Sequence, residues 1–295
     1  MNKIIYFLLI MCFKTYLFSS IDNSKNFSEK PKYILSICAL FKNEAKYLKE
    51  WIEYHRLVGV DHFYLYNVGS GDHFHTILQP YLEKKIVTLV QWPEAINLQN
   101  EDNAGKWALS TQIPAYENAV NFLAKGETEW LILLDISEYL VCPIGNIIGL
   151  LNEYTNYSAV TFPCDFFDAS DFSSKKLLIQ SVNLSGPPKK IIEKSVSKMI
   201  FKPDHCAGFI WPPYKCRFKT PNSTLAVNRQ LLRLNHYINR NALISSRIKP
   251  KLEIDNRAMS EAMISNVLSD GNLIEDQDRP IYLYIPELLK RMRHK

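Results

Sequence analysis

Apolar runs and amphipathic stretches alternate along the first third of the chain. Three short apolar runs, Tyr33 to Leu40, Val60 to Tyr66 and Ile86 to Trp92, are typical of buried strands. The segment from Glu44 to Val58 places apolar residues on one helical face, and Gly59 marks its end. Because strands and helices alternate, the pattern predicts a parallel sheet with right-handed crossovers.

The chain is organised around a later apolar run, Trp130 to Leu134, which ends abruptly in Asp135, with Glu138 three positions on. An uninterrupted apolar run predicts a strand buried on both faces. Its last residue then emerges at the carboxyl edge of the sheet, where ligands bind in open α/β sheets. Carboxylates there can hold a hard divalent cation, and the cation can hold a diphosphate. The alternative is an acidic loop after a core strand.

Between these strands and the middle of the chain, the pattern is again helix and strand. Leu109 to Ala124 is helical in pattern, and Pro143 is expected to open a helix that reaches about Tyr154. Ser158 to Phe162 is strand-like, and Asp165 to Asp171 is expected to follow it as a loop.

The last third is mixed. Alternation from Ile191 to Phe201 predicts a strand or a hairpin arm, whereas Gly208 to Asn222, rich in proline and aromatic residues, is expected to be irregular. Two further strands (225–227 and 230–236) and two helices (257–268 and 286–295) complete the expected elements.

The N-terminal segment has the pattern of a leader. Lys3 precedes ten apolar residues, Ile4 to Phe13. Ten residues are too few to span a bilayer, which needs roughly 20. Residues 1–20 are therefore expected to be a signal peptide, with a short membrane anchor as the alternative, and residues 21–32 a linker. Either implies export through the secretory pathway or membrane association, in an orientation the sequence leaves open.

Charge is distributed unevenly. The net charge is +5, yet residues 175–250 hold fifteen Lys and Arg against two acids, Glu193 and Asp204. Such a block implies an anionic partner, or else a solvated basic face. The export-type leader pattern and the lack of a recognisable nucleic-acid motif argue against nucleic acid as the partner.

Cysteines and familiar motifs exclude several classes. The six Cys include no CxxC pair, which disfavours a zinc ribbon, although Cys206 and Cys216 could bridge. The sequence has no P-loop, no GxGxxG, no GxSxG elbow and no HExxH. Nucleotide-binding P-loop enzymes, dinucleotide oxidoreductases, α/β hydrolases and zincins are therefore disfavoured.

Taken together, the ordered motifs resemble glycosyltransferase family 92 and bacterial family 2-like relatives of the GT-A class. The matching segments run from Cys38 to Glu44, Tyr47 to His55, Gly59 to Tyr66, Gln112 to Tyr116, Trp130 to Leu140 and Asn235 to Tyr237. The resemblance implies a GT-A nucleotide-sugar-binding fold, with a central, mostly parallel (mixed) sheet flanked by helices. Residues 33–295 would form this single catalytic domain.

The resemblance also implies roles for individual residues. Donor-binding residues would be Lys42, Asn43, Glu44, Asn67, Asp72 and Gln112. Asp135 matches the first residue of the family's metal motif, and Asp135, Glu138 and His236 would be the metal ligands, with His205 a weaker candidate. Catalytic carboxylates would be Asp135, Glu138, Asp165 and Asp168, the base of an inverting reaction being sought among Asp165, Asp168 and Asp171.

The function implied is transfer of a sugar from a nucleotide-diphosphate sugar to a glycan or glycolipid acceptor. A divalent cation, Mn²⁺ or Mg²⁺, would neutralise the leaving diphosphate. One departure bears on this: Ser137 stands where the family has a second Asp. Glu138 would then have to compensate, or the metal is weakly held or absent. The alternative function is a weakened or inactive carbohydrate- or nucleotide-binding protein of the same fold.

Overall fold

The structure of the chain is a computed structural model. It describes residues 30–93, 107–169, 177–181, 190–191, 197–210, 215–220, 223–238, 273–274 and 280–293. The chain divides into two compact units, Met1–Pro31 and Lys32–Lys295. The predicted leader (1–20) and the predicted helix 257–268 lie outside the described residues. Among the helices that are described, none combines the length and the apolar character needed to cross a bilayer.

The first elements follow the sequence pattern. They are β1 (Tyr33–Phe41), α2 (Ala45–Val58), β2 (His62–Asn67), α3 (Phe74–Glu83) and β3 (Val87–Gln91). Both β1 and β3 pair with β2 in parallel. Helix α2 ends where Gly59 turns left-handed (φ +117°) and donates its N–H to the carbonyls of Arg56 and His55. The predicted strand–helix alternation is confirmed.

Strand β4 (Thr128–Leu133) returns to the centre of the sheet and pairs in parallel with β1, on the side away from β2. In the strand order β3-β2-β1-β4, strands β2 and β3 lie on one side of β1, and β4 lies on its other side. In such sheets the carboxyl ends of the two central strands border the crevice where ligands bind. Here those strands are β1 and β4.

The second half extends the sheet with antiparallel pairs. Strand β8 (Ser197–Phe201) lies antiparallel between β4 and β6 (Ala159–Asp168). Strands β11 (Thr224–Ala226) and β12 (Arg233–Ile238) pair in parallel with β6, while β5 (Glu138–Val141) runs antiparallel to β12. The short strands β7 (Lys190–Ile191) and β13 (Leu273–Ile274) end the sheet. The predicted fold class, a mostly parallel but mixed α/β sheet flanked by helices, is confirmed.

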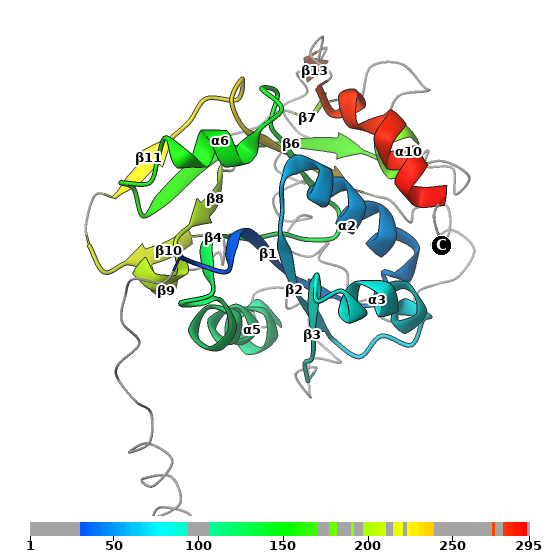
Figure 1. Cartoon of the computed structure of the whole chain (residues 1–295), viewed down its shortest axis with the longest axis horizontal. Helices are drawn as coiled ribbons and strands as arrows, with labels where there is room; N and C mark the ends of the chain where they lie inside the picture. The colour runs from blue at the N-terminus through cyan, green and yellow to red at the C-terminus, as the bar shows by residue number, and fades with distance from the viewer. Residues whose placement is uncertain are drawn as a thin grey trace, which may run out of the picture. The chain divides into compact units, whose positions relative to one another are not determined.

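Alternation along β1 divides the core between the two faces of the sheet. Leu35, Ile37 and Ala39 belong to the cluster that contacts α2, α3 and α6 (Ile147–Asn152). Cys38 and Leu40 belong to the cluster beneath the helical segment 108–124. That segment is an α-helix, α5 (Ile113–Asn118), between two π-helical turns, η1 (Ala108–Gln112) and η2 (Ala119–Ala124). Figure 1 shows α2 and α3 side by side, with α5 apart from them.

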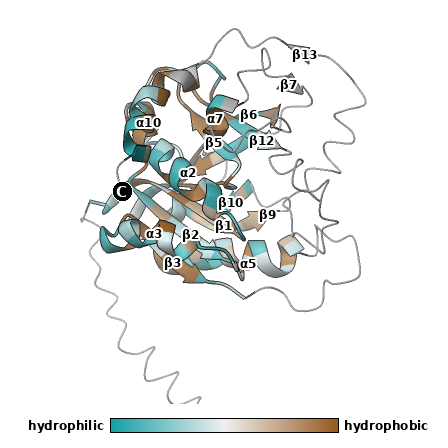
Figure 2. Ribbon diagram, turned by 90° about the vertical axis from the view of Figure 1, so that its right-hand side faces the viewer, coloured by the Kyte–Doolittle hydropathy of each residue, from teal (hydrophilic) through white to brown (hydrophobic). Residues whose placement is uncertain are grey.

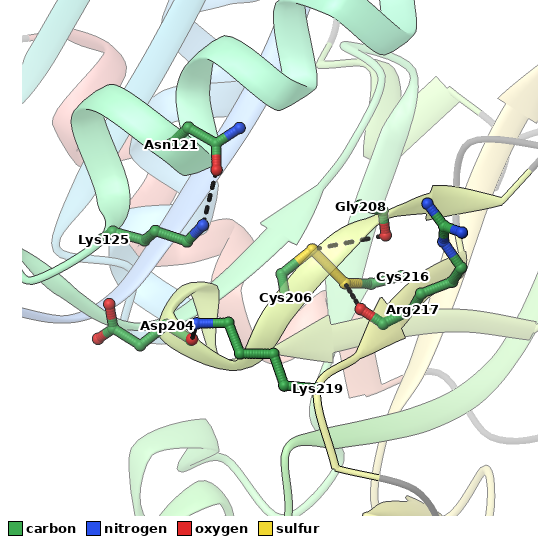
Figure 3. The surroundings of a disulfide bond; sticks show 8 residues. All are labelled: Asn121, Lys125, Asp204, Cys206, Gly208, Cys216, Arg217 and Lys219. Carbon is green, nitrogen blue, oxygen red and sulfur yellow. Dashed lines mark hydrogen bonds between the residues drawn. A yellow bond between two sulfur atoms is a disulfide. The ribbon is translucent and has the colours of Figure 1, made fainter.

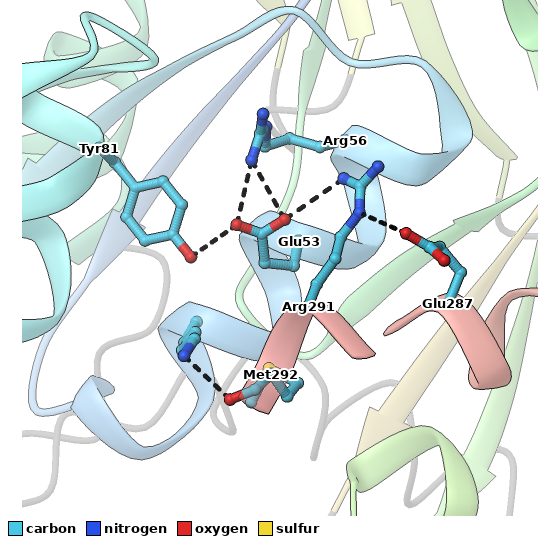
Figure 4. A network of polar contacts seen from close by, with 7 residues as sticks. Glu53, Arg56, Tyr81, Glu287, Arg291 and Met292 are labelled. Carbon is cyan, nitrogen blue, oxygen red and sulfur yellow. Dashed lines mark hydrogen bonds and ion pairs between the residues drawn. The ribbon is translucent and has the colours of Figure 1, made fainter. Parts of the chain in front are cut away.

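The C-terminal helix α10 (Ile285–Arg293) follows the 3₁₀ turn η4 (Pro280–Tyr284). An ion pair between Arg291 and Glu53 joins α10 to α2. Glu53 lies at the centre of this network (Figure 4): its carboxylate accepts from Arg56 at 3.0 Å and from the Tyr81 hydroxyl at 2.9 Å, and Arg291 reaches it at 3.3 Å. In Figure 2, α3 and α10 carry both hydrophobic and hydrophilic residues, as expected of helices with one face on a core.

Three of the later elements differ from the sequence analysis. The helix expected from Pro143 begins only at Ile147, capped by the Asn146 side chain, which accepts from the Gly149 N–H. Strand β5, which begins three residues after Asp135, was not predicted from the sequence. Asp165 and Asp168 were placed in a loop, but β6 continues through both, because the parallel partner β12 is supplied by residues about 70 positions later.

The segment expected to be irregular contains an antiparallel hairpin, β9 (Cys206–Ile210) with β10 (Lys215–Phe218). Cys206 and Cys216 form a disulfide across it (Figure 3), so the bridge that the sequence left open is present. The hairpin follows the 3₁₀ turn η3 (Pro203–His205), where the Lys219 side chain donates to the Asp204 carbonyl. One further short helix, α7 (Leu178–Ser181), is described.

Candidate functional site

The candidate site lies at the carboxyl ends of β1 and β4. Leu134 donates its backbone N–H to the Cys38 carbonyl, which keeps the chain against β1 for one residue beyond β4. Asp135 then leaves the sheet half-buried, and Ile136 and Ser137 form the turn into β5. The strand pattern therefore places Asp135 at the carboxyl edge of the sheet, as predicted from the sequence.

Glu138 occupies the inner side of this turn and is almost fully buried (1% exposed). Its carboxylate oxygens lie 2.8 Å from the Lys198 ammonium, and Oε2 also accepts the Asp135 backbone N–H at 2.9 Å. Burial by itself lowers the pKa of Lys198, but the charges of Glu138 and Asp135 outweigh burial and hold that pKa above its ordinary value. Lys198 is therefore a permanent cation inside the site.

His236 comes from β12, directly opposite Glu138 in the strand register. Its Nδ1 lies 3.5 Å from Oε1 of Glu138. Cys164, on β6, completes a group in which one ligand atom each from Glu138, Cys164 and His236 lies within 4.8 Å of the others. Burial, and then the negative charge of Glu138, raise the pKa of the Cys164 thiol well above its usual range. These three side chains are close enough to share a metal ion.

The helical segment 108–124 packs against the face of the sheet that carries Cys38 and Leu40. Tyr116 is buried, and Gln112 donates to its hydroxyl at 3.1 Å. Burial and then the charge of Asp135 raise the pKa of Tyr116 well above its usual value, so Tyr116 lies within electrostatic reach of Asp135. Gln112, predicted as a donor-binding residue, thus contacts Tyr116, on which the charge of Asp135 acts.

The loops after β1 and β2 hold each other. Asn43 adopts a positive φ of 56°, donates its backbone N–H to Ser70 and accepts the Gly71 N–H through its side chain. Asp72 accepts the Ala45 N–H at 2.8 Å, at the start of α2. Asn43 and Asp72 therefore build the loop framework, and their role in donor binding stays a prediction.

The other predicted donor residues border the same edge. Asn67 donates to the Gln91 side chain at 2.7 Å and accepts the Ser70 N–H, which ties β2 to β3 and to the following turn. Lys42 and Glu44 lie in the turn between β1 and α2. The structure thus gathers all six predicted donor residues around the ends of β1, β2 and the segment 108–124, while their contacts to a donor stay predictions.

The carboxylate of Asp165 has two arginine partners. Arg229 lies 2.6 Å from its Oδ2, and Arg233, only 2% exposed, lies 3.9 Å away. Asp168 is placed on β6 by its backbone, three residues further along, and Asp171 lies outside the described residues. The base therefore remains unassigned, and Asp165 is held by two cations.

Two further histidines are explained by structure alone. His205, the weaker metal candidate, is bonded through Nδ1 to the Ser158 hydroxyl at 2.8 Å, next to the disulfide hairpin. His55, on the apolar face of α2, is fully buried between the Trp51 carbonyl and the Leu140 N–H. Neither belongs to the described part of the Asp135 site.

Lys198 is the residue that the sequence reading missed. One sequence feature could have indicated it. Lys198 lies within the alternating strand from Ser197 to Phe201, in which every second residue is expected to be buried. A charged residue at such a position needs a buried partner of opposite sign. Glu138, sixty residues earlier, is that partner, and periodicity alone does not reveal such pairs.

Comparison with known proteins gives a consistent result. A family model described as Glycosyltransferase family 92 matches residues 32–267. A family 92 protein of Ricinus communis is 26% identical over 160 residues, which cover 54% of this chain and 25% of that protein. One of Oryza sativa subsp. japonica is 29% identical over 125 residues, covering 42% and 18%. The matched part is thus a quarter or less of these relatives' length.

Solved structures with detectable similarity are more distant. S. aureus TarS 1-349 in complex with UDP has a TM-score of 0.40 and 12% identity, over 88% of this chain and 71% of that one. The mannosyltransferase PcManGT from Pyrobaculum calidifontis, in complex with GDP-Man and Mn²⁺, has a TM-score of 0.40 and 11% identity, over 96% and 79%.

Proposed function

The chain belongs to glycosyltransferase family 92, whose model matches residues 32–267, and we propose that it transfers a sugar from a nucleotide-diphosphate sugar to an acceptor hydroxyl. In this proposal the acceptor is a glycan or a glycolipid, and the fold is of the GT-A type. Association with a membrane or export, suggested by residues 1–20, belongs to the same proposal.

The observation that carries the proposal is the position of Asp135. It follows the central strand β4 at the switch point of the sheet, beside the end of β1. Tyr116 and Gln112 line one side of it, and the Glu138–Lys198 pair lies behind it. A crevice with a few convergent polar groups at this place in an α/β sheet is where a nucleotide ligand is expected to bind.

The chemistry requires that the leaving diphosphate be stabilised and the acceptor hydroxyl be oriented. Gln112 bonds the Tyr116 oxygen, so the phenol retains its own proton to donate toward a ligand oxygen. His236 offers an imidazole from β12 on the other side of Glu138. These groups can orient a phosphorylated donor by hydrogen bonds.

A divalent cation, Mn²⁺ or Mg²⁺, is the family expectation, and it would supply Lewis-acid stabilisation of the leaving group. Glu138, Cys164 and His236 lie close enough to share one. Their present contacts do not fit that use, because the Lys198 ammonium already lies 2.8 Å from both Glu138 oxygens. No step of the proposed reaction is therefore assigned to a cation held by Glu138.

A second candidate is a weakened or inactive carbohydrate- or nucleotide-binding protein of the same fold. It is favoured by Ser137, which is buried and replaces the carboxylate usual in the resembled motif, and by Asp165, which two arginines already neutralise. Replacing Ser137 with Asp separates the two candidates. An increase in turnover identifies a weakened enzyme, and unchanged inactivity identifies a binding protein.

The direct test is a thermal-shift and hydrolysis screen of residues 21–295 with UDP-, GDP- and CMP-sugars, each with Mn²⁺, Mg²⁺ or EDTA. The proposal expects stabilisation by one donor class and slow release of its nucleoside diphosphate or monophosphate. If no donor stabilises the protein or is hydrolysed under any of these conditions, glycosyl transfer is rejected. Stabilisation without hydrolysis supports the second candidate.

A further inference from the structure

The carboxylate of Glu138 is the most constrained acid among the described residues of the site. It is 1% exposed and begins β5, where the register sets it opposite His236. Charged groups at such depth are retained only with a counter-charge and further hydrogen bonds. The surroundings of Glu138 therefore decide what this carboxylate can do.

Lys198 provides the counter-charge from a different part of the chain. It lies on β8, the antiparallel strand between β4 and β6. Its side chain is only 10% exposed. Its ammonium lies 2.8 Å from Oε1 and 2.8 Å from Oε2 of Glu138. Both oxygens of the carboxylate are thus engaged on the same side.

Glu138 also fixes the turn that carries Asp135. Its Oε2 accepts the Asp135 N–H at 2.9 Å, while its own backbone N–H donates to the Asp135 carbonyl at 3.0 Å. The two bonds close the turn from Asp135 to Glu138 from both directions. The orientation in which Asp135 leaves β4 therefore depends on the position of the Glu138 carboxylate.

A divalent cation bound by Glu138 conflicts with these contacts. The ion would have to displace the ammonium, which lies 2.8 Å from both Glu138 oxygens, or share the same carboxylate with it. Two cations on one buried carboxylate repel each other strongly. Ser137, the neighbouring turn residue, has no carboxylate with which to offset the repulsion.

We propose that Lys198 is a positioning residue: it neutralises Glu138 and keeps this carboxylate as the acceptor that fixes the Asp135–Glu138 turn. Glu138 is then not a metal ligand, and Asp135 presents its carboxylate to the donor. The consequence for the donor rests on the proposed function, whereas the assignment of Glu138 does not.

The first experiment uses Mn²⁺ alone, titrated into the full chain and followed by the electron paramagnetic resonance signal of free Mn²⁺. Glu138→Gln is expected to leave the half-saturating concentration within twofold of wild type. Lys198→Met, which frees the carboxylate, is expected to lower it at least tenfold. Lys202→Met, directly after the same strand, is the matched control and is expected to leave the half-saturating Mn²⁺ concentration unchanged.

Two results of this titration overturn the proposal. One is a tenfold or greater weakening of Mn²⁺ binding in Glu138→Gln, which would make Glu138 a ligand. The other is a folded Lys198→Met protein whose affinity for Mn²⁺ is unchanged. Neither requires a donor, so the titration is decisive even if no nucleotide sugar is ever hydrolysed.

The second experiment covers the case in which Lys198→Met does not fold. The double variant Glu138→Gln with Lys198→Met removes both charges and is expected to melt above Lys198→Met. The activity of the variants is then measured with a donor found in the screen. Lys198→Arg is expected to retain at least a third of wild-type kcat. The double variant is expected to have a kcat at least tenfold lower than wild type, with a KM within threefold of the wild-type value. A double variant with wild-type kcat overturns the positioning role.

Discussion

The guanidinium of Arg229 lies 2.6 Å from Oδ2 of Asp165, although the two residues are 64 positions apart. The contact joins the segment before β12 to β6. It also gives the Asp165 carboxylate a role as an ion-pair partner. The sequence offered Asp165 as a candidate catalytic base, and a base must be able to accept a proton from the acceptor hydroxyl.

We expect Asp165→Asn to act mainly on stability. The substitution leaves the buried Arg233 and the half-exposed Arg229 without their anionic partner, at a cost of about 1–3 kcal/mol in the free energy of unfolding. Urea unfolding measures this loss, and the exposed Glu153→Gln is the control. A variant with wild-type stability and no sugar transfer would instead make Asp165 the base.

Asp135→Asn tests the centre of the site. If Asp135 faces the donor, removing its charge is expected to lower kcat/KM for donor hydrolysis by about 10²-fold or more. Urea unfolding checks that the variant is folded, because the charge of Asp135 also acts on the buried Lys198.

The matched control for this variant is Glu129→Gln, an equally half-buried acid at the other end of β4, which is expected to keep wild-type activity. Equal losses in both variants would show that charge along β4, rather than the position of Asp135, matters for activity.

The buried histidines predict how stability depends on pH. Burial lowers the pKa of His55 from 6.5 to about 3 and that of His62 from 6.5 to about 4. The unfolded chain therefore binds more protons than the folded chain below pH 6.5. Each histidine should lower the free energy of unfolding as the pH falls through this window, by up to about 1.4 kcal/mol per pH unit.

This dependence is measured by urea unfolding at pH 7, 6 and 5. His55→Gln is expected to reduce the slope of stability against pH, because it removes one of the two buried imidazoles. A slope in His55→Gln equal to that of the wild type would contradict the assignment of His55 as a neutral core residue.

The disulfide between Cys206 and Cys216 closes a loop with a sequence separation of 10 residues. A loop of this length restricts the unfolded chain by about 2–3 kcal/mol in the loop-entropy account. The double variant Cys206→Ala with Cys216→Ala is expected to lose that much stability, as is the wild type in the presence of a reductant. If reductant destabilised the double variant equally, the effect would arise elsewhere.

The sequence was sufficient for the elements whose partners lie nearby in the chain. The strands β1 to β4 and the helices between them follow from apolar periodicity, because each buries its apolar face against its immediate neighbours. The position of Asp135 at the sheet edge followed from the same pattern, since a buried strand that ends in an acid emerges at its carboxyl end. Family membership was also visible in these local motifs.

What only the tertiary structure decided depends on contacts between distant segments. Strand β5 and the continuation of β6 through Asp165 exist because β12 pairs with both. The local sequence pattern does not predict that pairing. For the same reason the sequence could present Glu138 as a metal ligand, whereas the structure places Lys198 against it. A buried charge takes its role from its partner, and a partner sixty residues away is brought to it only by the fold.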